Sequence, residues 1–272
     1  GIWPNNGVKS PCWAKCFSCG ASQRRLTVSV AVELRHITKR FPGVIANKDV
    51  SIKVETGTVH ALVGENGAGK STVMKILYGM QRPDSGEILV NGEEVHFKNP
   101  NDAIDAGIGM VHQHFMLADN FTVLENIILG SEPKHGATID FAGARAKVVE
   151  MAAQYGLDID PDVLVEELGV GQRQRVEILK VLFRGANILI FDEPTSAIDA
   201  KAESIIFENL LKYTKDKTII FISHRFSTVK NADKIYVLDK GKIVEQGTHD
   251  DLLQISNGFY KKLYDSQFVA EI

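Results

Sequence analysis

The sequence predicts an α/β fold that is interrupted by an inserted helical lobe. Strand-like and helix-like segments alternate over most of the chain, and a glycine-rich loop joins one of these strands directly to a helix. In residues 122–183 the pattern is almost entirely helical, and strands then return. With 272 residues, the chain can bury one large core or two small ones. We therefore expect one α/β core with an insertion rather than two successive domains.

The first part of the expected core consists mainly of strands. Residues 28–37 alternate apolar and polar side chains, as a half-buried strand does, and residues 50–54 repeat this pattern. An Asn91-Gly92 pair between two strand-like segments predicts a tight hairpin. The strands expected in this part are residues 28–37, 50–54, 58–63, 87–90, 95–97 and 108–111, with a helix at 72–80.

The middle of the chain carries helix signals. Thr122 and Glu125 have the spacing of a capping box, in which each side chain bonds the other residue's backbone N–H. Residues 141–155 show helical spacing and stop at Gly156, and residues 172–183 form a further amphipathic segment. Beyond them we expect strands at 188–191, 218–222, 235–238 and 243–246, and helices at 200–213 and 248–253, the last opened by a Thr248–Asp251 capping box.

The glycine-rich loop has the pattern of a phosphate-binding loop. Residues 64–71 read Gly-Glu-Asn-Gly-Ala-Gly-Lys-Ser and fit G-x-x-x-x-G-K-[ST]. The glycines permit a tight turn that brings backbone N–H groups and a helix N-terminus close to phosphate oxygens. Lys70 supplies a mobile positive charge, and the Ser71 hydroxyl is a hard ligand for Mg²⁺. The residues expected to bind the nucleotide are Gly64, Glu65, Asn66, Gly67, Ala68, Gly69, Lys70, Ser71 and Thr72.

Two carboxylates follow a second buried strand. The apolar residues 188–191 are followed directly by Asp192 and Glu193, and α/β sheets bind ligands at the carboxyl ends of their strands. We expect Asp192 to lie opposite Ser71 and to hold Mg²⁺, directly or through water. Glu193 would then face the γ-phosphate and polarise the attacking water.

Composition narrows the range of partners. The hydrophobic content of 44% and charged content of 24% are those of an ordinary globular protein. A net charge of −3 gives no reason to expect nucleic-acid binding. No apolar run approaches the roughly 20 residues that span a bilayer. We therefore expect no transmembrane segment, so any membrane role requires a partner.

The first 30 residues differ from the rest of the chain, do not begin with Met, and contain all three cysteines. We expect a disordered or foreign leader. The C-x3-C-x2-C spacing of Cys12, Cys16 and Cys19 resembles the iron–sulfur motif of radical SAM enzymes, and a zinc site would need a fourth ligand such as His36. Free reduced thiols are the simpler interpretation, because the remaining chain has no cysteine.

Taken in order, the motifs resemble the nucleotide-binding domain of ABC transporters. The resemblance covers residues 32 to about 265. Besides the phosphate loop and Asp192, the matching positions are Phe41 (adenine stacking), Gln113 (Q-loop), Gly169, Gly171 and Gln172 (signature loop), Glu193 (catalytic carboxylate), Asp199 (D-loop) and His224 (switch histidine).

The resemblance implies a P-loop NTPase core with an antiparallel β subdomain and an inserted α-helical subdomain. The ATPase domain would span residues 31–265, with its α/β core at about 31–111 and 188–255 and its helical lobe at about 112–187. Residues 256–272 would form a C-terminal helix or tail.

The resemblance also implies a mechanism. Two copies, or one copy and a paired ABC ATPase domain, would bind head to tail and trap ATP between the phosphate loop of one and the signature loop of the other. Gln113 would join Ser71 and Asp192 at Mg²⁺, and Glu193, His224 and Gln113 would act in hydrolysis. The helical lobe would hold a membrane permease, which places the chain in the cytoplasm at the inner face of the cell membrane.

One position departs from the family pattern. The signature usually has Ser where this chain has Gly169, so one hydrogen bond to the γ-phosphate, worth roughly 1.5 to 3 kcal/mol, would be missing. Backbone donors could replace it, or hydrolysis could be slow.

Two parts of the chain resemble different subfamilies of ABC transporters. Residues 32 to about 190 are similar to the first ATPase domain of nucleoside and simple-sugar importers, and the remainder is similar to exporter ATPase domains, with a join near 196–201. We expect an ATP-hydrolysing importer subunit. The alternatives are a soluble ABC ATPase, and an engineered chimera that binds ATP but serves no transporter.

Overall fold

The computed structural model describes residues 29–112, 115–136, 138–192, 217–223 and 225–270. Four of the expected site residues, Gln113, Glu193, Asp199 and His224, lie outside this part of the chain, as do the three cysteines and the helix expected at 200–213. Within it, no helix is long and apolar enough to cross a membrane.

A six-stranded sheet forms the centre of the described fold, with the order β12-β11-β3-β10-β9-β6. Its neighbouring strands are parallel except for the β11–β12 pair. The strands are β3 (Val59–Val63), β6 (Ile108–Val111), β9 (Ile188–Asp192), β10 (Thr218–Ile222), β11 (Lys234–Asp239) and β12 (Lys242–Gly247).

Both faces of strands β3, β6, β9, β10 and β11 are buried, which explains why these strands are continuously apolar. In β9, Leu189 and Phe191 belong to one hydrophobic cluster, together with residues from the helices of residues 123–183. Ile188 and Ile190, which alternate with them along the strand, belong to a second cluster. This alternation follows from the two-residue period of a strand.

An antiparallel sheet covers the second face, with the order β2-β1-β4-β5. Between β4 and β5, Asn91 and Gly92 have φ values of 53° and 88°, which confirms the expected hairpin turn. The strands are β1 (Val30–Phe41), β2 (Val44–Glu55), β4 (Ser85–Val90) and β5 (Glu93–Val95).

The first two strands are longer than the sequence pattern predicted. Register shifts interrupt their pairing near His36 and Asp49, which both adopt positive φ, 52° and 58°. Such bulges break the strict alternation of apolar and polar residues, so the pattern marked only the regular parts of each strand.

The phenol of Tyr236 connects the two sheets. The Tyr236 hydroxyl of β11 donates to the Lys53 carbonyl oxygen of β2 at 2.6 Å and accepts from the Lys53 N–H at 3.0 Å. The ring itself is 1% exposed. The strand β2 is thereby fixed to the central sheet through both of its backbone groups at one residue.

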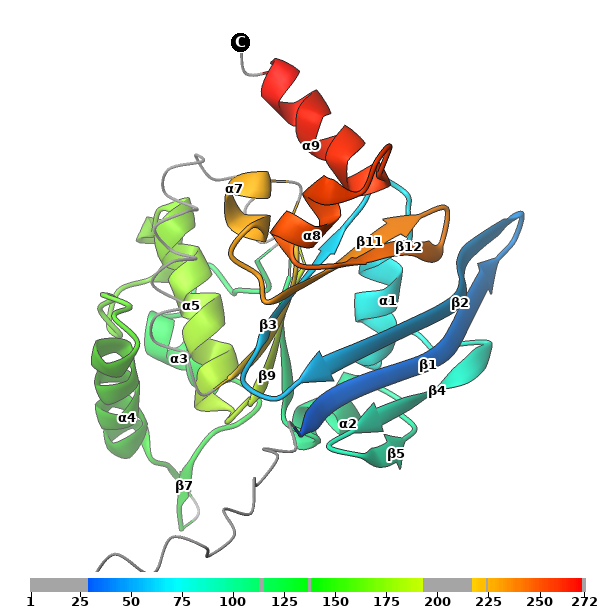
Figure 1. The fold of residues 1–272 in the computed structure, drawn as a ribbon. Coiled ribbons are helices and arrows are strands. Elements are labelled where there is room, and N and C mark those ends of the chain that lie inside the picture. The colour runs from blue at the N-terminus through cyan, green and yellow to red at the C-terminus, as the bar shows by residue number, and fades with distance from the viewer. Residues whose placement is uncertain (1–28, 113–114, 137, 193–216, 224, 271–272) are drawn as a thin grey trace, which may run out of the picture.

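Helices α3 (Val123–Ile128), α4 (Phe141–Gln154) and α5 (Val170–Phe183) lie together on one side of the central sheet, as Figure 1 shows in green. The capping box of Thr122 and Glu125 is confirmed. Helix α5 begins at Val170, two residues earlier than expected, so Gly171 and Gln172 lie in its first turn. The remaining small elements of this region are a 3-10 turn at Val165–Glu167 and a hairpin of β7 (Lys134–His135) and β8 (Thr138–Ile139).

The hairpin was not expected from sequence, because its two-residue strands are exposed and carry no apolar pattern. The same applies to the six-residue helix α2 (Pro100–Asp105). Neither element contributes to the nucleotide site described below.

The last elements pack beside the end of the sheet. Helices α7 (Phe226–Val229), α8 (His249–Gln254) and α9 (Phe259–Ala270) follow β10 and β12, and α9 forms the uppermost part of the fold in Figure 1. The Glu245 carboxylate accepts hydrogen bonds from the first N–H groups of α9, at Phe259 and Tyr260. The Thr248–Asp251 capping box at the start of α8 is confirmed.

Candidate nucleotide-binding site

The glycine-rich loop connects β3 to helix α1 (Lys70–Leu77), as the sequence predicted. Gly69 has φ of 100°, and a Cβ atom there would overlap the Ala46 carbonyl oxygen and lie 2.6 Å from the Asn47 amide nitrogen. A Cβ atom at Gly64 would overlap the Leu238 carbonyl oxygen. The loop therefore requires glycine at these two positions because neighbouring backbone approaches too closely for any side chain.

Lys70 is folded back into this loop. Its side-chain Nζ donates to the carbonyl oxygens of Gly64 at 2.9 Å and Glu65 at 3.0 Å, and the residue is only 4% exposed. A cationic ammonium group is thus held at the centre of a turn whose backbone N–H groups are the natural ligands of phosphate oxygens.

The end of β9 meets the start of α1. The Ser71 hydroxyl donates to the Asp192 carboxylate, with 2.8 Å between Oγ and Oδ1. Ser71 lies in α1, which follows β3, and Asp192 ends β9. Strand β10 lies between β3 and β9, so the pair joins segments that are not adjacent in the sheet. A hydroxyl and a carboxylate at this distance offer two hard oxygen ligands, which suits Mg²⁺. The juxtaposition predicted from sequence is present.

A pocket of 520 Å³ opens over the phosphate loop. Phe41, at the end of β1, forms one wall, and its ring is 38% exposed. Val44 and Ala46 of β2 extend this wall toward the loop. The remaining lining residues are Asn66, Gly67, Gly69, Lys70, Ser71 and Thr72. An exposed aromatic face at one end and a phosphate loop at the other match the two ends of a nucleotide.

Asn47 supports the loop and was missed in the sequence analysis. Its amide Nδ2 donates to the Gly69 carbonyl oxygen at 3.1 Å, and the side chain is fully buried. Its Oδ1 atom is also buried and has no hydrogen-bond partner among the described residues. No sequence signal could have identified it, because a single Asn within a strand carries no recognisable pattern.

The expected signature loop lies elsewhere on the chain. Gly169 forms the N-cap of α5 with φ of −68° and ψ of 162°, and its N–H donates to Gln172 Oε1 at 3.1 Å. None of Gly169, Gly171 and Gln172 lines the phosphate-loop pocket. The structure therefore joins Phe41, the phosphate loop and Asp192 in one region and leaves the signature loop outside that pocket.

His112, next to Gln113, faces the same region. Burial lowers the pKa of its imidazole, while the negative charge of Asp192 acts in the opposite direction. Its ring contacts Tyr78 edge to face, with 5.8 Å between ring centroids. The segment that leads to Gln113 is therefore close enough to the end of β9 for the charge of Asp192 to influence the pKa of His112.

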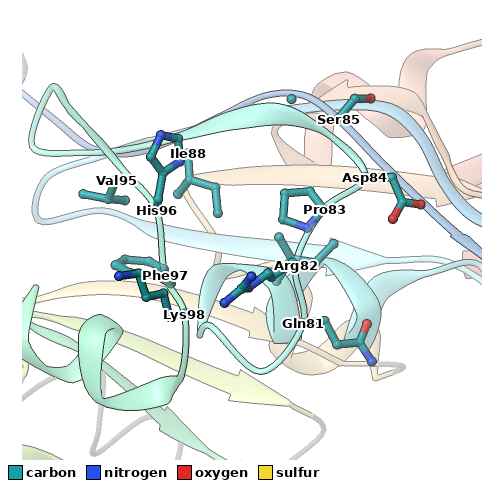
Figure 2. A pocket seen from close by; sticks show the side chains of 12 residues that line it. Gln81, Arg82, Pro83, Asp84, Ser85, Ile88, Val95, His96, Phe97 and Lys98 are labelled. Carbon is teal, nitrogen blue, oxygen red and sulfur yellow. The ribbon is translucent and has the colours of Figure 1, made fainter.

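A second pocket, shown in Figure 2, has a volume of 350 Å³ and is a different feature. It lies between the segment after α1 and the β4–β5 hairpin, and its labelled side chains include Arg82, His96 and Lys98. It shares no residue with the phosphate-loop pocket. Within the described residues, no cluster of three or more His, Cys, Asp or Glu side chains offers a metal site.

The central parallel sheet, the phosphate loop and the Ser71–Asp192 pair define a P-loop nucleotide-binding protein. Comparisons with known proteins narrow this class. The family model described as ABC transporter matches residues 47–196. The chain therefore belongs to the ABC transporter family, as an ATP-binding cassette.

The curated relatives include importers of nucleosides and sugars. The chain is 47% identical to the nucleoside import ATP-binding protein NupA of Lactococcus lactis subsp. cremoris, over 79% of this chain and 43% of that protein. It is 49% identical to the guanosine import ATP-binding protein NupO of Bacillus subtilis, over 78% of this chain and 42% of that protein. The chain thus spans about two fifths of the length of these relatives.

Solved structures agree with the fold. An ATP-binding cassette of an ABC transporter in its ADP conformation matches with a TM-score of 0.75 and 26% identity, covering 87% of this chain and 98% of that chain. A bacterial Atm1-family ABC exporter with ATP bound matches with a TM-score of 0.72 and 30% identity, covering 88% of this chain and 42% of that chain. The proposed join between importer-like and exporter-like parts lies outside the described residues and stays a prediction.

Proposed function

We propose that the chain binds and hydrolyses ATP and thereby drives import of a nucleoside or simple sugar through a separate membrane permease. The observation that carries this proposal is the contact of Ser71 with Asp192 at the edge of the phosphate-loop pocket. This contact supports the proposal because two hard oxygen ligands beside a loop of the phosphate-binding pattern would suit phosphoryl transfer, which needs a metal ion next to the phosphates.

ATP would lie along the pocket that begins at Phe41. The exposed ring would stack on adenine, and the backbone N–H groups of residues 65–72 would bind the phosphates. Lys70 would contribute its positive charge to the β- and γ-phosphates. The pocket of 520 Å³ is within the range of sites that bind small molecules.

Ser71 and Asp192, with Gln113, would hold Mg²⁺. When bound there, the ion would supply positive charge that stabilises the developing charge on the phosphate oxygens. The oxygen-only character of the Ser71–Asp192 pair fits this ion and does not fit a soft metal.

We assign hydrolysis to Glu193, which directly follows Asp192, and to two further residues that match motifs of the family, His224 and Gln113. Glu193 would polarise a water molecule, which attacks the γ-phosphorus while the bond to the β–γ bridging oxygen breaks. His224 and Gln113 would orient this water and contact the γ-phosphate. The products are ADP and inorganic phosphate.

The complete site would require a second ATPase domain. In one chain the signature residues Gly169, Gly171 and Gln172 do not line the phosphate-loop pocket, so they are available to a nucleotide held by a partner. A head-to-tail homodimer, or a pair with another ABC ATPase domain, would bring the first turn of α5 and Asp199 to the opposite ATP. The positive end of α5, 14 residues long, would then face the γ-phosphate.

The assignment to import rests on the relatives, which are import proteins for nucleosides, guanosine and glucose. A permease would dock on the helical region of α3, α4 and α5, and the chain would lie in the cytoplasm at the inner face of the membrane. The absence of a spanning helix among the described residues is compatible with a separate permease.

Comparing the wild type with Glu193→Gln tests the catalytic part of this proposal. The wild type should turn over ATP in the presence of Mg²⁺. The variant should bind ATP, fail to hydrolyse it, and elute as a dimer in gel filtration with ATP and Mg²⁺. If the two proteins behave alike in both assays, the catalytic assignment of Glu193 is wrong. Co-purification with a permease would separate an importer subunit from a soluble ATPase of the same family.

A further inference from the structure

Two side chains of α5 hold both backbone polar groups of Met116. The Met116 N–H donates to Glu177 Oε1 at 2.7 Å, and Lys180 Nζ donates to the Met116 carbonyl oxygen at 3.0 Å. Glu177 and Lys180 are three positions apart, so they lie on the same face of the helix. We call this arrangement the Met116 clamp.

The clamp contains a residue that is unusual on the buried face of a helix, the acidic residue Glu177. Glu177 is 3% exposed, and burial raises the pKa of its carboxyl group. Burial likewise lowers the pKa of the Lys180 ammonium group, while the charge of each residue partly compensates the other. An apolar pair would pack against the sheet at a lower desolvation cost. Holding the backbone of residue 116 is a property that an apolar pair would not have.

The side chain of Met116 does not hold this segment in place. It is 59% exposed, so little apolar surface is buried at this residue. Two residues later, the Ala118 N–H and carbonyl groups are bound by the Asn126 side chain of α3, at 2.8 Å and 3.0 Å. Side-chain bonds to its backbone therefore fix this segment to α5 and α3, in addition to the packing of Leu117 against the core.

We propose that Glu177 and Lys180 are positioning residues that fix the segment after Gln113 to helix α5. This inference rests on the proposed function, in which Gln113 helps to hold Mg²⁺ and contacts the γ-phosphate of the ATP bound to its own chain, and so acts as a sensor of that nucleotide. The N-terminal residues of the same helix, Gly169 to Gln172, serve the nucleotide of the partner domain. The clamp thus joins the sensor of one ATP to the helix that contacts the other.

The clamp should affect turnover more than nucleotide affinity. Neither Glu177 nor Lys180 lines the phosphate-loop pocket, so ATP binding to one chain should not depend on them. Turnover would require the Q-loop to contact the ATP of its own chain while the start of α5 contacts the ATP of the partner domain. This simultaneous contact should depend on the clamp.

Three variants test the inference. Glu177→Leu removes the acceptor for the Met116 N–H, and Glu177→Gln keeps an acceptor oxygen of the same shape. Glu150→Leu on α4 is the matched control, because Glu150 is exposed. For each protein we would measure hydrogen exchange of the Met116 amide without nucleotide, together with KM and kcat for MgATP.

In Glu177→Leu, exchange of the Met116 amide should accelerate by about tenfold, as expected for loss of one hydrogen bond, and kcat should fall by a similar factor. KM should stay within about twofold of the wild type, since the binding pocket is intact. Glu177→Gln should behave nearly as the wild type, and Glu150→Leu fully so. If Glu177→Leu does not fold, Lys180→Met tests the carbonyl half of the clamp with the same measurements of kcat and KM.

Unchanged exchange in Glu177→Leu, or faster exchange with unchanged kcat, would overturn the inference while leaving the proposed function intact. A wild type without any ATP turnover would instead remove the proposed function, and this inference with it.

Discussion

The Ser71 hydroxyl donates to the Asp192 carboxylate across 2.8 Å, although 121 positions separate the two residues in the chain. Ser71 is fixed by the first turn of α1, and Asp192 by the last position of β9. The pair therefore depends on correct assembly of the whole central sheet. Binding of a cation there would therefore require the assembled sheet as well as the side chains of Ser71 and Asp192.

Asp192→Asn should weaken Mg²⁺-dependent ATP binding by roughly ten- to a hundredfold, the usual effect of changing a group that supports a metal ligand set. Asn retains an oxygen that accepts from Ser71, so the fold should persist while the negative charge is lost. The measurement is a Mg²⁺ titration of nucleotide binding, with binding in EDTA as the reference. Asp105→Asn on α2 is the control, and equal Mg²⁺ dependence of all three proteins would contradict the assignment.

Gly169→Ser should increase ATP turnover. The backbone at this position is extended, and a Cβ atom would meet only Gln172 Oε1, at 3.8 Å. Serine therefore fits, and its hydroxyl would add one charge-assisted hydrogen bond to the γ-phosphate, which is worth about tenfold or more in rate. Steady-state ATPase measurements decide this, and an equal or lower rate would show that the loop does not contact the nucleotide as proposed.

Alanine substitutions should distinguish two glycines of the phosphate loop. At Gly69 an added methyl group would overlap the Ala46 carbonyl oxygen, so we expect a loss of about 3 kcal/mol or more in the free energy of unfolding. At Gly67, with φ of 83°, a Cβ atom meets nothing within 4 Å, and only the positive φ costs energy, about 1 kcal/mol. Urea denaturation of both variants would measure these losses in the free energy of unfolding. A larger loss for Gly67→Ala than for Gly69→Ala would show that the loop is arranged differently.

His60 should make stability depend on pH below neutrality. Burial, and secondly the charge of Lys234, lower the pKa of this histidine to about 4, against 6.5 in the absence of these effects. Its Nε2 lies 2.7 Å from the Thr58 hydroxyl, which donates its own proton to the Glu55 carbonyl oxygen, so Nε2 must be the donor. Protonation would therefore fall on Nδ1, which is buried and has no hydrogen-bond partner in the part of the chain that the structure describes.

Because the folded pKa lies below the unfolded one, the stabilisation is present above pH 6.5 and is lost as the pH falls toward 4. The loss in the free energy of unfolding should reach about 2 kcal/mol at pH 5. His60→Phe retains a ring beside Tyr236 and should lose this part of the pH dependence. Denaturation of both proteins at pH 7.5 and pH 5 measures it, and parallel pH profiles would refute the prediction.

The parts of the fold that were predicted correctly are those with local chemical signals. The Asn91-Gly92 hairpin, the capping boxes at Thr122 and Thr248, and the apolar strand before Asp192 each depend on a few adjacent residues. The loop at residues 64–71 has an equally local pattern. Its meeting with Asp192 could be expected because strand ends converge at one edge of a parallel sheet.

The features that were missed depend on contacts between distant residues. Asn47 supports Gly69 from another strand, and the carboxylate of Glu177 is buried against a segment 61 positions away. In sequence, Glu177 looks like an ordinary surface residue of an amphipathic helix. The early start of α5 was missed because Gly169 and Gly171 resemble a loop, although the backbone there already turns into the helix.

The bonds of the Tyr236 hydroxyl to both backbone groups of Lys53 have a consequence for relative motion of the two sheets. Sliding of the antiparallel sheet over the parallel one would break both hydrogen bonds at once and leave their buried polar atoms unsatisfied. The wall at Phe41, which belongs to the antiparallel sheet, should therefore keep its position relative to the phosphate loop, which follows β3 of the parallel sheet. A nucleotide that spans the two sheets would then bind to a surface of fixed shape.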